Sequence, residues 1–281
     1  MSRSPYAEKY DGIFDPETER IDEINEKLSL IQSKNGLVFG TDAYMLSAYV
    51  KKSPRAVVCE LGSGTGVAAL LLLAKEKAAT VYAYEVQQTF AELIKRNAAL
   101  NRVEDKLFVI AKDIRDAGPS DLGGECDMVI SNPPYMKTTA GKRNEHDEKY
   151  IARHEVCGDI YDFAAAAKRL LKFGGSFYCV YRPDRLIDLV CALRQNALEP
   201  KLMTFIHSDC ESEPSMVLIE ARKGGRPSLR ITEPLIIYDN TNEVGKLGAR
   251  RMAEAAQTVY DTCSFEHITK IQASERSQNK K

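Results

Sequence analysis

An apolar run leads directly into a turn rich in glycine. Residues 57–61 (Val-Val-Cys-Glu-Leu) precede residues 62–66, whose glycines are Gly62, Gly64 and Gly66. Glycines permit a tight turn and a close approach of the backbone to a ligand. Their spacing is not that of a dinucleotide site, and no Gly-Lys of a phosphate-binding P-loop follows. Glu60, one place before the end of the apolar run, suits a ligand with a cationic amine better than a pyrophosphate.

A second run whose residues could take part in a reaction is Asn132-Pro133-Pro134-Tyr135, which follows the apolar segment 128–131. Two prolines remove two backbone donors and fix the direction of the chain, which is more than a simple turn requires. A Pro-Pro turn capped by asparagine also occurs as a purely local structure. Its place at the end of an apolar segment, downstream of the glycine turn, favours a functional site.

Both runs need a scaffold, and the chain from residue 57 onward supplies an alternation of apolar runs and amphipathic segments that is typical of a parallel sheet. The expected strands are 57–61, 80–84, 107–111, 128–131, 177–181, 201–207 and 216–221; the expected helices are 67–76, 87–100, 160–171 and 185–196. We expect the third of these helices to end at Gly174-Gly175, because glycine takes the left-handed conformation that closes helices. The pattern predicts one doubly wound α/β domain over residues 35–239.

Three segments lie outside this alternation. Residues 1–34 are polar and predicted to be a partly helical extension. Residues 136–159 are rich in charge, and we expect a lid loop on the substrate side, since long loops in compact domains are usually functional or mobile. Residues 240–281 are predicted to be a polar tail with a helix from about 249 to 260 and a disordered end.

The overall charge is nearly balanced, with 39 Lys+Arg against 40 Asp+Glu in 281 residues. This argues against a strongly basic nucleic-acid binder, whose affinity comes largely from Lys and Arg. The first 26 residues hold three basic and eight acidic residues, however, so the remainder is mildly basic.

Two exclusions follow from composition. The longest apolar run, Val67–Ala74, is far shorter than the ~20 residues of a membrane-spanning helix, and the N-terminus has no apolar signal region, so we expect a cytoplasmic protein without membrane contact. The seven cysteines never form a C-x-x-C pair, and Cys59, Cys126 and Cys179 lie in apolar runs. Buried reduced thiols are favoured over disulfides or a metal site.

The glycine turn resembles motif I of the class I methyltransferases that use S-adenosyl-L-methionine (SAM). This resemblance implies a Rossmann-like α/β fold with a seven-stranded, mostly parallel sheet flanked by helices on both faces, and SAM as cofactor. It implies that Glu85, closing the second strand, accepts both ribose hydroxyls while Val86 packs on the adenine. Asp113, closing the third strand, is expected to bind the adenine amino group, with Ile114 beside the ring.

In the families that carry Asn-Pro-Pro-Tyr, the motif receives a planar nitrogen attached to an sp² carbon. The resemblance implies that the Asn132 side-chain oxygen and the Pro133 carbonyl each accept one N–H bond, which turns the lone pair toward the SAM methyl group; Asn132 is also expected beside the cofactor. Tyr135 would stack on the substrate, with Pro134 fixing the turn between them. The rate enhancement of methyl transfer then comes from orientation of the two reactants and from charge stabilisation, without a nucleophilic residue or a metal ion.

Resemblance outside the core motifs bears on the substrate. Residues 35–43 are similar to an N-terminal motif of amino-methyltransferases in which a Thr-Asp pair, here Thr41-Asp42, contacts the methionine end of SAM. Residues 148–155, 216–227 and 234–238 resemble the bacterial tRNA (adenine-N6) methyltransferases that modify the adenine 3′ of the anticodon of valine tRNA. The resemblance, from about residue 21 to 238, implies a tRNA substrate.

Basic residues in the lid and in residues 222–230 are expected to follow a phosphate backbone at the mouth of the site, although such runs are often only solvated faces. The candidates are Lys137, Arg143, Arg153, Lys223 and Arg226. His154 is interpreted as structural or lid-positioning rather than as a general base.

Two alternatives stay open at this point. A glutamine amide in a protein such as a release factor also presents a planar NH2, but the enzymes of that kind usually carry a longer helical segment in front of the first strand. A SAM- or RNA-binding module without catalysis is disfavoured by the intact run at residues 132–135, because a binder has no need to align an amine lone pair.

Overall fold

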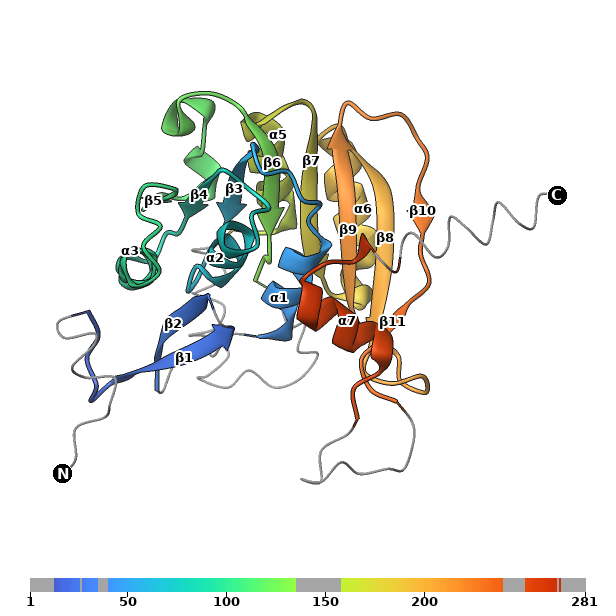
Figure 1. The fold of residues 1–281 in the computed structure, drawn as a ribbon. Helices are drawn as coiled ribbons and strands as arrows, with labels where there is room; N and C mark the ends of the chain where they lie inside the picture. The colour runs from blue at the N-terminus through green and yellow to red at the C-terminus, as the bar shows by residue number, and fades with distance from the viewer. Residues whose placement is uncertain are drawn as a thin grey trace, which may run out of the picture.

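The computed structural model describes residues 13–25, 27–34, 40–134, 158–239, 251–266 and 268. In this part of the chain, a nine-stranded sheet has the order β10-β8-β9-β7-β6-β3-β4-β5, with β11 also pairing with β8 (Figure 1). The strands are β3 (Val57–Leu61), β4 (Thr80–Tyr84), β5 (Leu107–Ile110), β6 (Cys126–Ser131), β7 (Leu171–Tyr181), β8 (Leu198–His207), β9 (Pro214–Lys223), β10 (Arg230–Ile231) and β11 (Leu235–Ile236). All seven predicted strands are confirmed. The two short strands β10 and β11 were not predicted.

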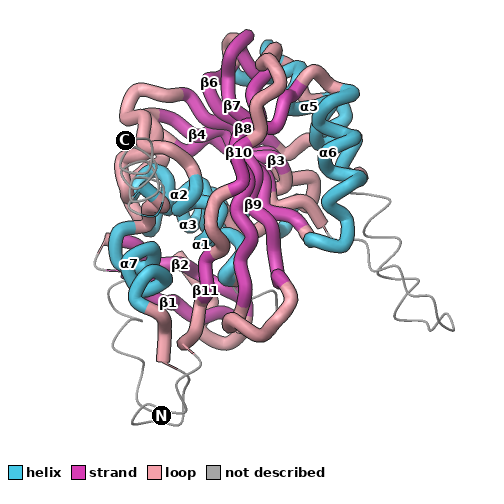
Figure 2. Tube along the Cα trace, turned by 90° about the vertical axis from the view of Figure 1, so that its right-hand side faces the viewer, coloured by secondary structure: helices cyan, strands magenta, loops and turns pink. Residues whose placement is uncertain are grey.

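The sheet is parallel from β5 to β7, and only β9 runs against its neighbours β7 and β8. Helices cover both faces, which confirms the predicted fold class (Figure 2). The helices are α1 (Thr41–Tyr49), α2 (Val67–Ala74), α3 (Gln88–Leu100), α5 (Ile160–Leu170), α6 (Leu186–Gln195) and α7 (Glu254–Thr262). Successive residues of a strand point to opposite faces; Val58 accordingly joins the core under α1, α2, α3 and α7, and Cys59 the core under α5 and α6.

The junction between α5 and β7 differs from the prediction. The helix ends at Leu170 and the strand begins at Leu171, so the glycines at 174 and 175 do not close the helix. They lie inside β7, where the register with β6 shifts and Gly174 has φ +79°. A Cβ on Gly175 would lie 3.0 Å from the carbonyl oxygen of Asp127. These glycines therefore permit an irregular strand and a close backbone approach.

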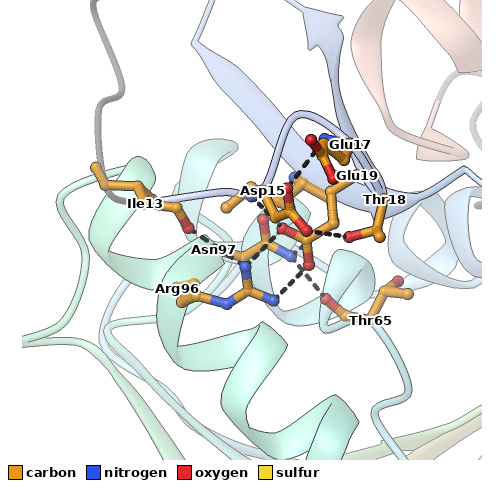
Figure 3. Close-up of polar contacts among 9 residues, drawn as sticks. Ile13, Asp15, Glu17, Thr18, Glu19, Thr65, Arg96 and Asn97 are labelled. Carbon is orange, nitrogen blue, oxygen red and sulfur yellow. Dashed lines mark hydrogen bonds and ion pairs between the residues drawn. The ribbon is translucent and has the colours of Figure 1, made fainter. Parts of the chain in front are cut away.

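Of the segment 1–34, which was predicted to be partly helical, the described residues 13–25 and 27–34 form a hairpin and contain no helix. Strand β1 (Glu19–Asn25) pairs antiparallel with β2 (Leu28–Ser33). The side-chain amides of Asn97 in α3 and of Asn101, which follows the helix as its C-cap, continue the pairing beyond β2. Asn97 Oδ1 accepts from Ile31 N at 2.7 Å, and Asn101 Oδ1 accepts from Ser29 N at 3.0 Å. Arg96 of the same helix donates to both carboxylate oxygens of Glu19, at 2.6 and 2.7 Å (Figure 3).

The helix predicted in the C-terminal segment is present as α7, beginning and ending a few residues later than expected. It packs into the core next to α1, with Ala256, Val259 and Cys263 fully buried. The ring of Tyr260 stacks on Tyr44 with centroids 4.9 Å apart. This part of the segment is therefore integrated into the fold rather than a detached polar tail.

The thiols and the helices bear on the two exclusions drawn from composition. Cys59, Cys126 and Cys179 are buried thiols outside any disulfide, as predicted, whereas Cys191 and Cys210 are also in no disulfide but are exposed. Among the described residues, no helix is long and apolar enough to cross a membrane. In the same residues, no group of three or more His, Cys, Asp or Glu side chains is arranged to hold a metal ion.

Candidate active site

The predicted site residues gather where parallel strands end at one edge of the sheet. Leu61, the last residue of β3, pairs with Tyr84 of β4 on one side and with Ser131 of β6 on the other. The next residues in each strand, Gly62, Glu85 and Asn132, therefore leave the sheet side by side. The carboxyl edge of an open parallel sheet is where ligands bind in doubly wound folds.

The three glycines of the turn serve different purposes. All have left-handed backbone angles, with φ of +72° at Gly62, +54° at Gly64 and +78° at Gly66. A Cβ on Gly66 would lie 2.9 Å from Cγ2 of Ile94 in α3, so this glycine allows α2 and α3 to pack closely. A Cβ on Gly64 would meet nothing within 4 Å. The middle of the turn is thus open to a ligand, while its end is closed by packing.

Glu85 joins the glycine turn to the start of α3. Its Oε2 accepts from Gly64 N at 2.8 Å, and its Oε1 accepts from Gln87 N at 2.8 Å. Burial raises the pKa of this carboxyl group, and the backbone hydrogen bonds oppose the rise. Val86, beside it, is half-buried.

Glu60 lies beneath the same turn and is 3% exposed. Its Oε2 accepts from Ala69 N in α2 at 3.1 Å. Burial raises the pKa of Glu60 to about 8, and the charge of Glu85 adds to the rise. Two acids whose ionised forms are both disfavoured by burial would be relieved by a nearby cation. This edge of the sheet is therefore suited to a positively charged ligand.

Asp113 does not close a strand, contrary to expectation, because β5 already ends at Ile110. It caps a short 3-10 helix, η1 (Ile114–Asp116), and accepts from Arg115 N at 2.8 Å. The guanidinium of Arg115, with Nε 3.0 Å from Oδ1, lowers the pKa of Asp113. Ile114 is buried at 6% exposure. Asp113 stays near the site, but any ligand bond to it must compete with Arg115.

The residues after β6 lie directly beside the glycine turn. Ser131 Oγ donates to the carbonyl oxygen of Leu61 at 2.9 Å, which ties the end of β6 to the residue before Gly62. Pro133 is buried, whereas Asn132 and Pro134 are half-buried. Asn132 and Pro133 thus directly follow a strand end that is tied to the residue before the glycine turn.

The remaining predicted residues belong to α1 or lie outside the described residues. Thr41 and Asp42 form the first turn of α1, with Thr41 exposed and Asp42 half-buried. The predictions that fall outside the described residues are those for Tyr135, Lys137, Arg143, Arg153 and His154.

Lys223 and Arg226 were expected at the substrate mouth, and the structure shows that this is wrong. Lys223 ends β9 and its Nζ donates to the carbonyl oxygen of Leu171 and lies 3.5 Å from Oε1 of Glu125. Glu125 precedes β6 and Asn132 follows it, so the six residues of β6, about 20 Å at ~3.3 Å per residue, separate the two ends. Because β9 is antiparallel, its basic end lies at the opposite edge of the sheet.

Two features at this edge of the sheet were missed from the sequence. Asn97 is fully buried, and its Nδ2 donates to the carbonyl oxygen of Thr65 at 3.3 Å, inside the glycine turn (Figure 3). Arg182 and Asp184, which follow β7, lie at the same edge as Asn132. The run Arg-Pro-Asp-Arg after a predicted strand was a signal available for the second of these.

Comparisons with known proteins agree with this geometry. The methyltransferase small domain model matches residues 29–188. A curated tRNA1(Val) (adenine(37)-N6)-methyltransferase from Porphyromonas gingivalis is 27% identical over 224 residues, 77% of this chain and 87% of the relative. One of the same name from Aeromonas hydrophila is 28% identical over 188 residues, 66% of this chain and 76% of the relative.

Solved structures show the same fold. A predicted O-methyltransferase from Agrobacterium tumefaciens superposes with a TM-score of 0.62 at 21% identity, covering 80% of this chain and 97% of that one. TYW2 of Pyrococcus horikoshii, in complex with MeSAdo, gives a TM-score of 0.53 at 15% identity, with 75% and 74% covered. Because the family match spans more than half of the chain and includes the glycine turn, Glu85 and Asn132, the chain belongs to the methyltransferase small domain family.

Proposed function

We propose that this protein transfers a methyl group from SAM to the N6 amine of an adenine in tRNA, and that the adenine is the one 3′ of the anticodon of valine tRNA. The observation that carries the proposal is the placement of Asn132 and Pro133 beside the glycine turn, fixed by the bond from Ser131 to Leu61. The names of the relatives, tRNA1(Val) (adenine(37)-N6)-methyltransferases, supply the substrate.

The residues at this edge fit SAM. Gly64 leaves open space where a ligand can approach the backbone. Glu60 and Glu85 have pKa values raised by burial, and both gain from a cationic neighbour. When bound, SAM supplies a methyl group activated by its positively charged sulfur. In this proposal Glu85 holds the ribose hydroxyls, Val86 and Ile114 border the adenine, and Thr41 and Asp42 contact the methionine end.

The substrate amine is oriented by acceptors on the chain. The side-chain oxygen of Asn132 and the carbonyl oxygen of Pro133 each accept one N–H bond, so both hydrogens of the amine are held. The nitrogen lone pair is then drawn out of conjugation with the ring and faces the methyl donor. Fixed orientation and aligned dipoles supply the rate enhancement, since no covalent intermediate is needed. Residues 35–239 are proposed as the catalytic domain, against which α7 packs.

The test compares tRNA nucleosides, by mass spectrometry, from cells with and without this protein. The proposal expects N6-methyladenosine to disappear at one position of valine tRNA and to return with the wild-type chain but not with Asn132→Ala. Purified protein should methylate unmodified valine tRNA in the presence of SAM. Unchanged nucleosides, together with methylation of a release factor and not of tRNA, would replace this proposal by transfer to a glutamine amide.

A further inference from the structure

A cavity of about 500 Å³ lies at the carboxyl edge of the sheet, outside the residues that the proposed methyl transfer uses. It is open to solvent rather than enclosed. It is formed by the turn after β7 and the start of β9. The lining residues are Arg182, Pro183, Asp184, Glu213, Pro214 and Ser215.

The cavity begins one strand away from the candidate methyl-transfer site. Ser131 at the end of β6 pairs with Cys179 of the neighbouring parallel strand β7. Asn132 follows Ser131, and Arg182 follows the last residue of β7, so both leave the sheet at the same edge. Parallel neighbours are about 4.8 Å apart. A nucleotide next to one held at Asn132 is therefore within reach of this cavity.

Arg182 is held in a fixed orientation by Asp184. Its Nε donates to Oδ1 at 2.9 Å and its Nη2 donates to Oδ2 at 2.8 Å. The two side chains are 37% and 53% exposed, so the pair adds little to stability. It does present the flat guanidinium in one plane beside the prolines.

The composition of the lining distinguishes between two parts of a nucleotide. A phosphate would meet two carboxylates, Asp184 and Glu213, against one guanidinium, and this balance repels an anion. A base carries no charge, can stack on an arginine plane, and offers N–H groups to carboxylate oxygens. The cavity therefore suits the base of an unpaired nucleotide.

We propose that this cavity is a subsite for the unstacked base that flanks the target adenine, with Arg182 as the contact on which that base stacks. The proposal rests on the proposed tRNA substrate. Stacking of a base on an aromatic side chain is worth ~1–3 kcal/mol, or about 5- to 150-fold in affinity, and we expect the planar guanidinium to contribute in the same range. Loss of the contact should raise KM for tRNA by a factor in this range and leave SAM affinity unchanged.

The experiment uses the full chain and full-length valine tRNA ligated from synthetic halves. Steady-state methylation is measured for wild type, Arg182→Ala and Arg182→Lys, and SAM affinity is measured by calorimetry. Arg55→Ala is the matched control, because it removes an exposed arginine that precedes β3 at the opposite edge. Both Arg182 variants should raise KM for tRNA at least about fivefold, since lysine keeps the charge but loses the plane, while the control stays at the wild-type value.

Abasic tRNA identifies the base. Removing one base that flanks the target adenine should raise the wild-type KM as much as Arg182→Ala does, with no further rise when the two changes are combined. Full activity of Arg182→Lys would show a charge contact only, and additive effects would show independent sites; either result overturns the subsite. If wild type does not methylate tRNA at all, the proposed function itself fails. Normal wild-type methylation with unaffected Arg182 variants removes the subsite alone.

Discussion

Replacing Glu60 by glutamine should change how the stability of the protein depends on pH. Glutamine keeps the shape of the side chain and its amide oxygen can still accept from Ala69 N, but it cannot ionise. In the folded protein burial raises the pKa of Glu60 from 4.5 to about 8. The folded state therefore holds a proton that the unfolded chain releases between about pH 5 and 8, and wild-type stability falls as pH rises through this window.

The size of the effect follows from the same shift. Each pKa unit corresponds to about 1.4 kcal/mol. Glu60 alone should therefore lower the free energy of unfolding of the wild-type protein by on the order of 3–4 kcal/mol as the pH rises from 5 to 8. The free energy of unfolding of Glu60→Gln should equal that of wild type near pH 5 and exceed it by about that amount at pH 8. Glu85 titrates in both proteins with a pKa raised in the same direction, so its contribution largely cancels in the comparison.

The assay is urea unfolding at pH 5, 6.5 and 8 without SAM, followed by circular dichroism and checked for reversibility. Glu104→Gln is the matched control, because it removes an exposed carboxyl group from a turn far from the glycine loop; its stability should follow wild type at every pH. Parallel pH profiles for wild type and Glu60→Gln would refute the view that this buried carboxyl group is protonated in the folded protein.

Three further predictions concern the proposed site. Asn132→Ala should lower kcat about 100-fold, from the loss of one oriented acceptor worth ~3 kcal/mol, while calorimetry finds unchanged SAM affinity; equal turnover would remove Asn132 from the reaction. Glu85→Ala should weaken SAM binding in calorimetry without abolishing folding, and a wild-type dissociation constant would exclude it from the cofactor site. Gly66→Ala should lower the free energy of unfolding by about 1–3 kcal/mol, because its methyl group would overlap Ile94. Gly64→Ala, whose added methyl group has no neighbour within 4 Å, should cost less stability than Gly66→Ala but weaken SAM binding. A larger loss of unfolding free energy for Gly64→Ala, together with unchanged SAM affinity in calorimetry, would contradict these assignments.

The sequence predicted the central strands closely because each is a short apolar run with its own boundaries. β3 and β4 have the expected bounds, and the turn between β3 and α2 follows from local glycine chemistry. Such features depend on residues close together in the chain. The order of the acids and of Asn132 along one edge then follows from parallel pairing.

The errors share a cause, which is dependence on contacts between distant segments. The hairpin at residues 19–33 is stabilised by the side-chain amides of Asn97 and Asn101, which no local pattern reveals. The basic end of β9 was predicted at the wrong edge of the sheet, because the residues of a strand do not show whether it pairs parallel or antiparallel with its neighbours. Asp113 was misassigned by a smaller error, since β5 ends three residues before it and Arg115 competes for its carboxylate.

Asn97 couples the stability of the N-terminal hairpin to that of the glycine turn. One amide group serves the backbone of Ile31 on one side and the carbonyl oxygen of Thr65 on the other, with no solvent to replace either bond. Opening the hairpin would leave a buried amide unsatisfied at the turn, and such a group costs about 1–3 kcal/mol. The N-terminal hairpin and the glycine turn are therefore linked in one cooperative unit, and a ligand that stabilises the turn must also, by reciprocity, lower the population of molecules in which the hairpin is open.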